Sequence, residues 1–221
     1  MESARSPENG DSARNKMMGK SPFDLENQNE NIDSRIVAAM ERVSQAFRVL
    51  LWNQSKETSL SPIQIQILIF LMFHSEEKRK VSYLAEEFNM TKATISDSIK
   101  VLAQKRMISK KSEMHDTRSY VIYLTSKGLE VAKKIATFAG RMQTPINRLD
   151  LADKENLLIS LMDIIHYLNK TGVITIQRMC KTCVYFSPGS DTTHHFCRLL
   201  NQKLFDKDLR IDCPEHVLGT N

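Results

Sequence analysis

The stretch VSYLAEEFNMTKATISDSIKVL, residues 81–102, decides the fold of this 221-residue chain. In its first half, Leu84, Ala85 and Phe88 are spaced to face one side of a short helix. Asn89-Met90 then marks a tight turn, because Asn tolerates the backbone conformations that turns require. The first half therefore predicts a short amphipathic helix that ends at this turn.

The second half predicts another amphipathic helix. Thr91 is placed to cap its first turn, as Ser82 is for the preceding helix. Ile95, Ile99 and Leu102 recur at helical spacing and form the inward face. The outward face is polar and partly basic, with Lys92, Thr94, Ser96, Asp97 and Lys100. Two short helices joined by a tight turn, the second with a polar outer face, are typical of a helix-turn-helix.

The segments on either side extend this pattern to a winged helix. Ser61-Pro62 is a good helix start, and the segment 63–73, IQIQILIFLMF, is apolar on nearly every side, so its helix should be buried. After the helix-turn-helix, ISKKS (108–112) and SYVIYL (119–124) are strand-like and flank a polar tip, which predicts a β-hairpin.

Long helices are expected at both ends of this unit. The segment 32–52 places one apolar stripe on a helix, formed by Ile36, Met40, Val43, Phe47 and Leu50. Thr125 should cap a helix whose stripe is Val131, Ile135, Phe138 and Met142, and Pro145 should end or bend it. A last helix over 151–170 aligns Leu157, Leu161, Ile165 and Leu168. The expected fold is mainly α, a winged helix-turn-helix with one β-hairpin.

Charge and composition limit the function classes. The chain carries 31 basic and 26 acidic residues, and residues 81–134 hold ten of the basic ones against six acidic. A basic middle segment favours an anionic partner. Residues 1–30 have almost no aliphatic side chains, so we expect a disordered tail. The chain opens without an apolar leader, and its longest apolar run, 67–73, is too short for a membrane span, so a cytoplasmic protein without a membrane partner is expected.

Three segments together resemble the MarR family of bacterial transcription regulators. They are LSPIQIQILIFL (60–71), the stretch 81–102 and HDTRSYVIYLTSKG (115–128). The sharpest part of the resemblance is Asp116-x-Arg118, followed by Leu124-Thr125 and Gly128. The resemblance covers roughly residues 32–170 and stops before the cysteines.

The resemblance implies a homodimer, joined through its first and last helices, that binds near-palindromic operator DNA. Each recognition helix would enter a major groove, and each hairpin would lean on the adjacent minor groove. Arg118 would insert there, held by Asp116, because a narrow minor groove concentrates negative potential. The implied DNA-binding residues are Thr91, Lys92, Ala93, Thr94, Ser96, Asp97, Lys100, Lys110, Lys111, Asp116 and Arg118.

The chain departs from the family pattern at two positions. A glycine usually follows the recognition helix, whereas Arg106 stands here, so either Arg106 takes the left-handed conformation or the helix ends differently. Asp97 occupies an outer position that is often Arg, so the target sequence is not implied. Some relatives hold a small molecule beside the dimer helices. We interpret Trp52, His166 and Tyr167, which could line such a pocket, as core or interface residues, and the effector is not identified.

All four cysteines lie in the last fifth of the chain, at Cys180, Cys183, Cys197 and Cys213. Clustered thiols in a reducing cytosol indicate a metal site more often than disulfides. A zinc ribbon usually presents two close pairs, whereas this chain has one C-x-x-C and two single cysteines. That arrangement favours an iron–sulfur cluster, 4Fe–4S, whose corners take ligands singly. Tyr185 would help to exclude water.

Zinc is the alternative cofactor, and His194, His195 or His216 could replace a cysteine as its ligand. Four thiols without a metal are the third interpretation. With either metal, residues 173–221 should form a small module that folds only when the metal is bound, because so few aliphatic residues cannot make a core. The domain between tail and module would span residues 31–172.

The sequence therefore predicts a dimeric DNA-binding regulator, presumed a repressor, whose four-cysteine module senses redox state, oxygen or metal supply. The alternative is a MarR-type regulator with a structural zinc and an organic effector. A weaker alternative is an iron–sulfur electron-transfer protein or enzyme subunit. No Gly-rich nucleotide loop and no nucleophile–base set is present in the sequence, so an enzyme is not expected.

Overall fold

The computed structural model describes residues 21–113, 116–189 and 194–219. The chain forms two compact units, Met1–Leu50 and Leu51–Asn221. Residues 173–221, the cysteine segment, belong to the second unit together with the winged helix, whereas the sequence predicts a separate module.

The first unit contains α2 (Leu25–Glu30) and most of α3 (Ile32–Thr58). Asp24 caps α2 by accepting a hydrogen bond from the Glu26 backbone N–H at 2.9 Å. The buried Asn27 amide donates to Ser34 Oγ at 2.9 Å and so ties α2 to α3. The expected disorder through residue 30 is therefore wrong for α2, because polar caps order it although its aliphatic side chain, Leu25, is exposed. Residues 1–20 of that predicted tail lie outside the described residues.

The apolar stripe predicted on α3 exists but is not covered. Ile36 is 47 % exposed and Val43 is 48 % exposed. Within the described chain, Ser34 is the only buried residue of this 27-residue helix. An apolar stripe this long on a helix needs a partner surface to be stable in water.

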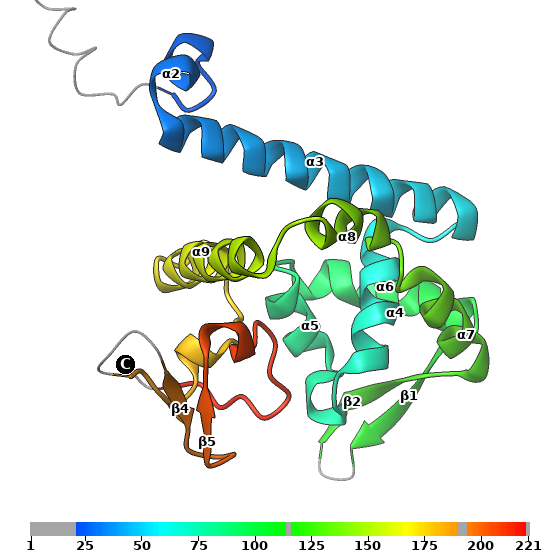
Figure 1. Ribbon diagram of the computed structural model, residues 1–221. Helices are drawn as coiled ribbons and strands as arrows, with labels where there is room; N and C mark the ends of the chain where they lie inside the picture. Colours follow the sequence, from blue (N-terminus) through cyan, green and yellow to red (C-terminus); the bar gives the residue numbers. More distant parts are fainter. Residues whose placement is uncertain (1–20, 114–115, 190–193, 220–221) are drawn as a thin grey trace, which may run out of the picture. The chain divides into compact units, whose positions relative to one another are not determined.

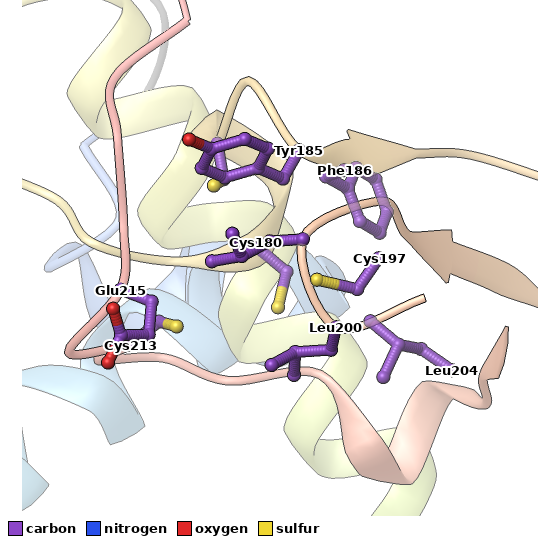
Figure 2. A pocket seen from close by; sticks show the side chains of 10 residues that line it. Cys180, Tyr185, Phe186, Cys197, Leu200, Leu204, Cys213 and Glu215 are labelled. Carbon is purple, nitrogen blue, oxygen red and sulfur yellow. The ribbon is translucent and has the colours of Figure 1, made fainter. Parts of the chain in front are cut away.

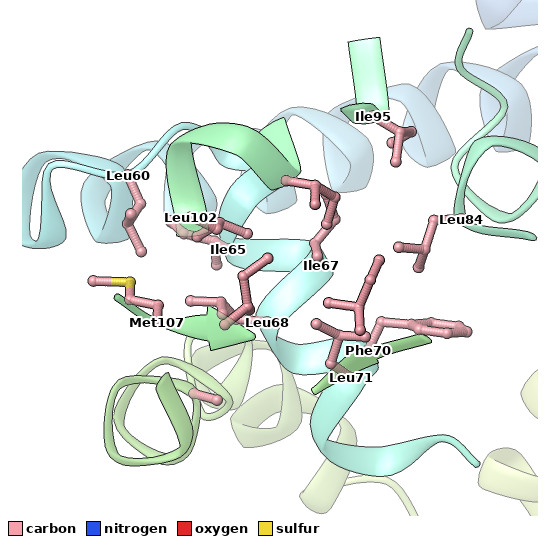
Figure 3. Packing of buried hydrophobic residues seen from close by; sticks show 14 of the residues in the cluster. Leu60, Ile65, Ile67, Leu68, Phe70, Leu71, Leu84, Ile95, Leu102 and Met107 are labelled. Carbon is pink, nitrogen blue, oxygen red and sulfur yellow. The ribbon is translucent and has the colours of Figure 1, made fainter. Parts of the chain in front are cut away.

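Helix α4 (Pro62–Phe73) is the centre of the second unit, as expected from its apolar sequence. Ser61 and Gln64 form a capping box, and Pro62 occupies the first helical position. The helix packs against α6, α7 and β2, and its side chains fill the main core (Figure 3). The buried residues that α4 contributes are Gln64, Ile65, Ile67, Leu68, Phe70 and Leu71.

The helix-turn-helix consists of α5 (Val81–Glu87) and α6 (Lys92–Gln104) (Figure 1). The turn is where the sequence places it, with Asn89 at φ 50° and the Met90 N–H bonded to the Ala85 carbonyl at 2.8 Å. The expected cap at Ser82 is wrong. The helix starts two residues earlier, at Val81, with Lys80 as its N-cap and without a side-chain cap.

The end of α6 confirms the prediction for Arg106. Its φ is 58°, in the left-handed region. The Met107 N–H bonds to the Leu102 carbonyl at 3.0 Å, and the Arg106 N–H bonds to the Ala103 carbonyl at 2.9 Å. These bonds are the Schellman pattern, which satisfies carbonyls at the helix end although no glycine is present.

The wing is the antiparallel pair β1 (Ile108–Glu113) and β2 (Asp116–Leu124), in the register Ile108↔Leu124. A short 3₁₀ turn, η1 (Glu76–Lys78), precedes α5. Just after it, the Arg79 carbonyl accepts the Ile122 N–H at 3.0 Å, which fixes the wing to the body of the winged helix. The tip residues 114–115 lie outside the description.

The helix after the wing is interrupted rather than continuous. Helix α7 (Ser126–Ile135) starts at its predicted cap, Thr125, but α8 (Gly140–Asn147) begins only after a turn. The single stripe expected from Val131 to Met142 is therefore wrong beyond Ile135. Pro145 lies inside α8, which ends two residues later, and α9 (Leu151–Lys170) follows.

The cysteine segment contains η2 (Cys180–Thr182) and η3 (Asp206–Asp208). Its three short strands pair in the order β3 (Phe186–Ser187), β4 (His195–Cys197) and β5 (Gln202–Leu204). The segment packs on α9 through a second core of buried residues. They are Met162, Met179, Cys180, Leu204 and Leu209.

We predict that Gly128→Ala severely destabilises the winged helix. A Cβ on Gly128 would lie 1.8 Å from the Met107 carbonyl oxygen, and backbone atoms cannot move aside cheaply. The expected loss is at least about 2 kcal/mol of unfolding free energy, at the upper range of overpacking. Urea unfolding followed by circular dichroism measures it. The control is Gly140→Ala, whose Cβ would meet nothing within 4 Å, and an equal loss in both variants would contradict the close approach.

Candidate DNA-binding surface and four-cysteine cavity

The outer face of α6 carries the predicted DNA contacts. Ile95, Ile99 and Leu102 are fully buried against the core, which turns the opposite side of the helix to solvent. Thr91 caps the helix by accepting the Thr94 N–H at 3.1 Å. The predicted residues on this face are all exposed: Thr91, Lys92, Ala93, Thr94, Ser96, Asp97 and Lys100. Backbone N–H groups at such a capped N-terminus suit phosphate contacts.

The wing contributes two further cations. Lys110 and Lys111 are exposed on β1, and the Lys110 Nζ lies 4.5 Å from the centre of the Tyr120 ring. The backbones of Asp116 and Arg118 belong to β2. Their side chains lie outside the described part of the structure, so the proposed pairing between them stays a prediction.

Two of the four cysteines flank η2. The Cys183 N–H bonds to the Cys180 carbonyl at 3.0 Å, which closes a tight turn and brings both residues of the C-x-x-C pair to one side. Cys183 also forms an isolated antiparallel bridge with Leu218. Hydrogen bonds of the backbone therefore position this pair.

The single cysteines come from two other segments. Cys197 is the last residue of β4 and lies between Phe186 of β3 and Gln202 of β5. Cys213 follows an isolated parallel bridge between Arg178 and Asp212, and its N–H bonds to the Arg178 carbonyl at 2.9 Å. The sheet and the bridge together bring distant cysteines to the C-x-x-C turn.

All four cysteines line one cavity. Figure 2 shows the sulfur atoms of Cys180, Cys197 and Cys213 directed toward the same space. The cavity has a volume of about 20 Å³ and is partly open to solvent. Its remaining lining is mainly apolar, from Tyr185, Phe186, Leu199, Leu200, Leu204 and Glu215.

Arg210 donates hydrogen bonds to two of the sulfurs. Its backbone N–H lies 3.3 Å from Cys180 Sγ, and its Nη1 lies 3.6 Å from Cys213 Sγ. Burial raises the pKa of the Cys180 thiol, and the Arg210 N–H partly offsets this. Such N–H···S bonds stabilise thiolate ligands and tune the potential of a bound cluster.

The three histidines named as substitute ligands are turned to other partners. His195 Nε2 lies 3.0 Å from Asp206 Oδ1, and His216 Nε2 lies 2.9 Å from Thr182 Oγ1. His194 stacks on Phe205 with ring centres 5.8 Å apart. Among the described residues that line the cysteine cavity, none is a histidine. Within the described ranges, no three His, Cys, Asp or Glu side chains converge tightly enough to hold one metal ion.

Arg178 is a charged centre that the sequence analysis missed. Its side chain is only 8 % exposed and pairs with two carboxylates. Nη1 and Nη2 bind the carboxylate of Glu87, at the end of α5, at 2.6 and 3.1 Å. Nε and Nη2 bind the carboxylate of Asp212 at 2.6 and 2.9 Å. One guanidinium therefore joins the helix-turn-helix to the residue before Cys213.

Other groups complete this cluster. Arg178 Nη1 donates to the Tyr83 hydroxyl at 3.0 Å, and His74 Nε2 lies 3.0 Å from Asp212 Oδ2. Hydrogen bonds from Arg178 hold the pKa of Asp212 at about 2. Burial disfavours the charged guanidinium, but its bonds to Asp212 and Glu87 raise the pKa of Arg178 above its ordinary value. A lone Arg beside an apolar segment was the only sequence signal for this cluster.

Comparisons with known proteins agree with this geometry. Residues 58–119 match the model of the MarR family. The solved structures that resemble the chain include a MepR–DNA complex from S. aureus, with 20% identity, a TM-score of 0.53 and coverage of 60% of this chain and 97% of that chain. A MarR transcriptional regulator from Methanosarcina mazei Go1 has 17% identity, a TM-score of 0.53 and coverage of 62% and 97%.

A further S. aureus structure, MepR in its DNA-binding conformation, has 19% identity and a TM-score of 0.54, and covers 60% of this chain and 98% of that chain. A search of curated proteins found no match. The fold is thus the winged helix of MarR structures, as predicted. None of the helices in the described ranges has the length and hydropathy needed to cross a membrane.

We predict that Arg178→Met destabilises the second unit by about 2–4 kcal/mol, because it leaves the Glu87 carboxylate half-buried without its charged partner. The estimate is below that for a fully buried pair, since Asp212 is 44% exposed. Urea unfolding measures the loss. Arg141→Met, on α8, is the control, and a similar loss there would contradict a specific role of the ion pairs.

Proposed function

We propose that this protein is a MarR-type transcription regulator that binds operator DNA. The observation that carries the proposal is the exposed, N-capped face of α6, set in a winged helix by a fully buried opposite face. The fold delivers such a helix to a major groove, and Lys110 and Lys111 on the wing extend the cationic surface toward the adjacent backbone. Repression is the mode we expect, and a location in the cytoplasm stays a prediction.

The acting form is proposed to be a homodimer. Helix α3 exposes the stripe that includes Ile36, Val43 and Phe47. On α9, Leu157 is 40 % exposed and Leu161 is 36 % exposed, at the spacing of one helical face. A second copy of the chain would cover both stripes, and a two-fold dimer suits a near-palindromic operator.

The four-cysteine cavity is proposed to hold an iron–sulfur cluster. The donor set fits, because four thiols line one apolar cavity and two of the sulfurs already accept hydrogen bonds from Arg210. The sulfurs surround the cavity without converging on one ion position. A cubane suits ligands spread in this way, because each thiolate binds a different iron. When bound, the cluster would supply a redox-active and oxygen-sensitive centre.

This chain would use the site as a sensor of redox state, oxygen or metal supply. The cysteine segment has a small core, so its order depends on what joins its four cysteines. The segment also packs on α9 through Met162 and Met179. A change of order at the cavity can therefore reach the DNA-binding unit directly.

A second candidate is a structural zinc combined with an organic effector. It is favoured by a pocket of about 600 Å³ beside the cysteine cavity, lined partly by His166, Lys170 and Lys181. His166 Nδ1 is buried and has no hydrogen-bond partner within the described structure. Trp52 and Tyr167, which we interpreted as core or interface, are 54 % and 66 % exposed, so neither is core in the described chain.

We predict that Arg118→Ala weakens operator binding by about 1–3 kcal/mol, because it removes the minor-groove contact while leaving the core intact. Duplexes selected by the wild-type protein from a random pool provide the probe, titrated at fixed salt. Size-exclusion chromatography checks that the dimer persists. Unchanged affinity would count against the docking of the wing. Failure of the wild type to select any duplex would favour the electron-transfer alternative.

Lys110→Ala should weaken binding to selected and random duplexes alike, because an exposed lysine that contacts phosphate carries no sequence information. The salt dependence of the affinity should also become shallower, by about one counterion for each site lost. Titrations at several salt concentrations measure both effects. An effect restricted to one operator base would mean that Lys110 reads sequence instead.

Protein purified without air should be brown and contain about four irons per chain. Each of the four Cys→Ser variants should lose the colour and become protease-sensitive after about residue 172, while the winged helix stays folded. Metal analysis and limited proteolysis provide the measurements. Colourless protein with one zinc per chain would favour the second candidate.

A further inference from the structure

We propose that Arg178 is the positioning residue that transmits the state of the four-cysteine cavity to the helix-turn-helix, through its paired carboxylates Glu87 and Asp212. The inference rests on the proposed sensing function and names the route of its regulation.

The first step is that one buried guanidinium holds two chain segments in a fixed relation. Arg178 uses separate N–H pairs for the Glu87 and Asp212 carboxylates, with the shortest N···O distance 2.6 Å on each side. Its planar fork accepts each carboxylate only in a narrow range of orientations. A shift of Asp212 must therefore move the guanidinium, and so Glu87, or break a charged pair whose Arg178 side is buried.

The second step connects Asp212 to the cavity. Asp212 is the neighbour of Cys213, and its backbone is bridged to Arg178. Residues 212–214 form the arm that carries Cys213. This arm is also tied to the winged helix by Lys78, whose Nζ donates to the Pro214 carbonyl at 3.4 Å. When Cys213 is held by a cluster, the arm has one position. Without that ligand bond, this arm would be held by hydrogen bonds and ion pairs, among them those to Arg178, His74 and Lys78.

The third step connects Glu87 to the reading surface. Glu87 is the last residue of α5, and the turn that follows leads directly to the α6 cap, Thr91. The turn is stiff because the Met90 N–H is bonded to the Ala85 carbonyl at 2.8 Å. Leu84 of α5 packs in the same core as the buried face of α6. A displacement of Glu87 would therefore change the orientation of α6.

A second ion pair joins the cysteine segment to a helix, and it can be compared with the Arg178–Glu87 pair. Lys181 forms an ion pair with Asp163 on α9, beside the apolar contacts of Met162. Asp163 is 59% exposed, whereas Glu87 is 17% exposed, so solvent screens the α9 pair more strongly than the α5 pair. Apolar packing also tolerates small sliding movements that a bidentate charged pair does not. The Arg178 route is therefore the stiffer of the two.

Two matched variants separate these routes, since each neutralises one carboxylate that pairs with the cysteine segment. Glu87→Gln weakens the α5 route, and Asp163→Asn removes the α9 ion pair. Full-length protein is purified without air and compared before and after the iron is removed with an oxidant and a chelator. Hydrogen exchange of the peptide spanning residues 81–90 is measured by mass spectrometry, together with affinity for the selected duplex.

In wild type and in Asp163→Asn, loss of iron should speed exchange in this peptide at least about fivefold and change duplex affinity by a similar factor, the lower range of allosteric coupling. In Glu87→Gln the iron-loaded and iron-free forms should differ by less than about twofold in both. Arg178→Lys, which keeps the charge but not the fork, is a second variant should Glu87→Gln fold poorly, and it should behave like Glu87→Gln.

Three results overturn the inference. If Glu87→Gln keeps the full response, or if only Asp163→Asn loses it, the signal travels by another route and the sensor itself stands. If wild type shows no response although iron is bound and the duplex is recognised, the cavity does not regulate binding. Iron content and duplex selection, measured on the same samples, show whether the proposed cofactor or DNA binding has failed as well.

Discussion

The organisation of the second unit depends on a single buried cation. Arg178 lies between the end of α5 and the arm that carries Cys213, and it satisfies a carboxylate from each. An unpaired guanidinium at 8 % exposure would be strongly destabilising, so the two segments have to remain together wherever this side chain is buried. The cysteine segment is therefore an extension of the winged helix, and both lie in one compact unit.

This attachment explains how a segment with so little core can be ordered. The core that the segment shares with α9 has few buried apolar side chains, and one of them, Met162, comes from α9. Two stabilising sources act together, packing on α9 and ion pairs to α5, and the proposed cluster would add a third. Because these sources share residues, a change at the cavity would alter the contacts with the winged helix. The proposed sensing role needs such a dependence.

The main parts of the fold could be predicted from local patterns. The buried stripe of α6, the cap at Thr91 and the left-handed residue Arg106 follow from side-chain periodicity and from the chemistry of helix ends. The prediction failed where local signals were weak. A continuous stripe did not prevent the break after Ile135, and the polar segment before Ile32 forms α2 because Asp24 and Asn27 bond to neighbouring backbone and side-chain groups.

For the candidate sites, residue identity and spacing were enough to select the exposed face of α6 and the four thiols that line one cavity. They could not exclude His194, His195 and His216 as lining residues, because the partners of these side chains come from segments distant in sequence. Nor could they identify Arg178, whose partners Glu87 and Asp212 are 91 and 34 residues away. The sequence by itself determined the helix faces, caps and thiol set, since these depend on near neighbours. Only the tertiary structure decided which charges meet, because folding alone brings such distant groups within hydrogen-bond distance.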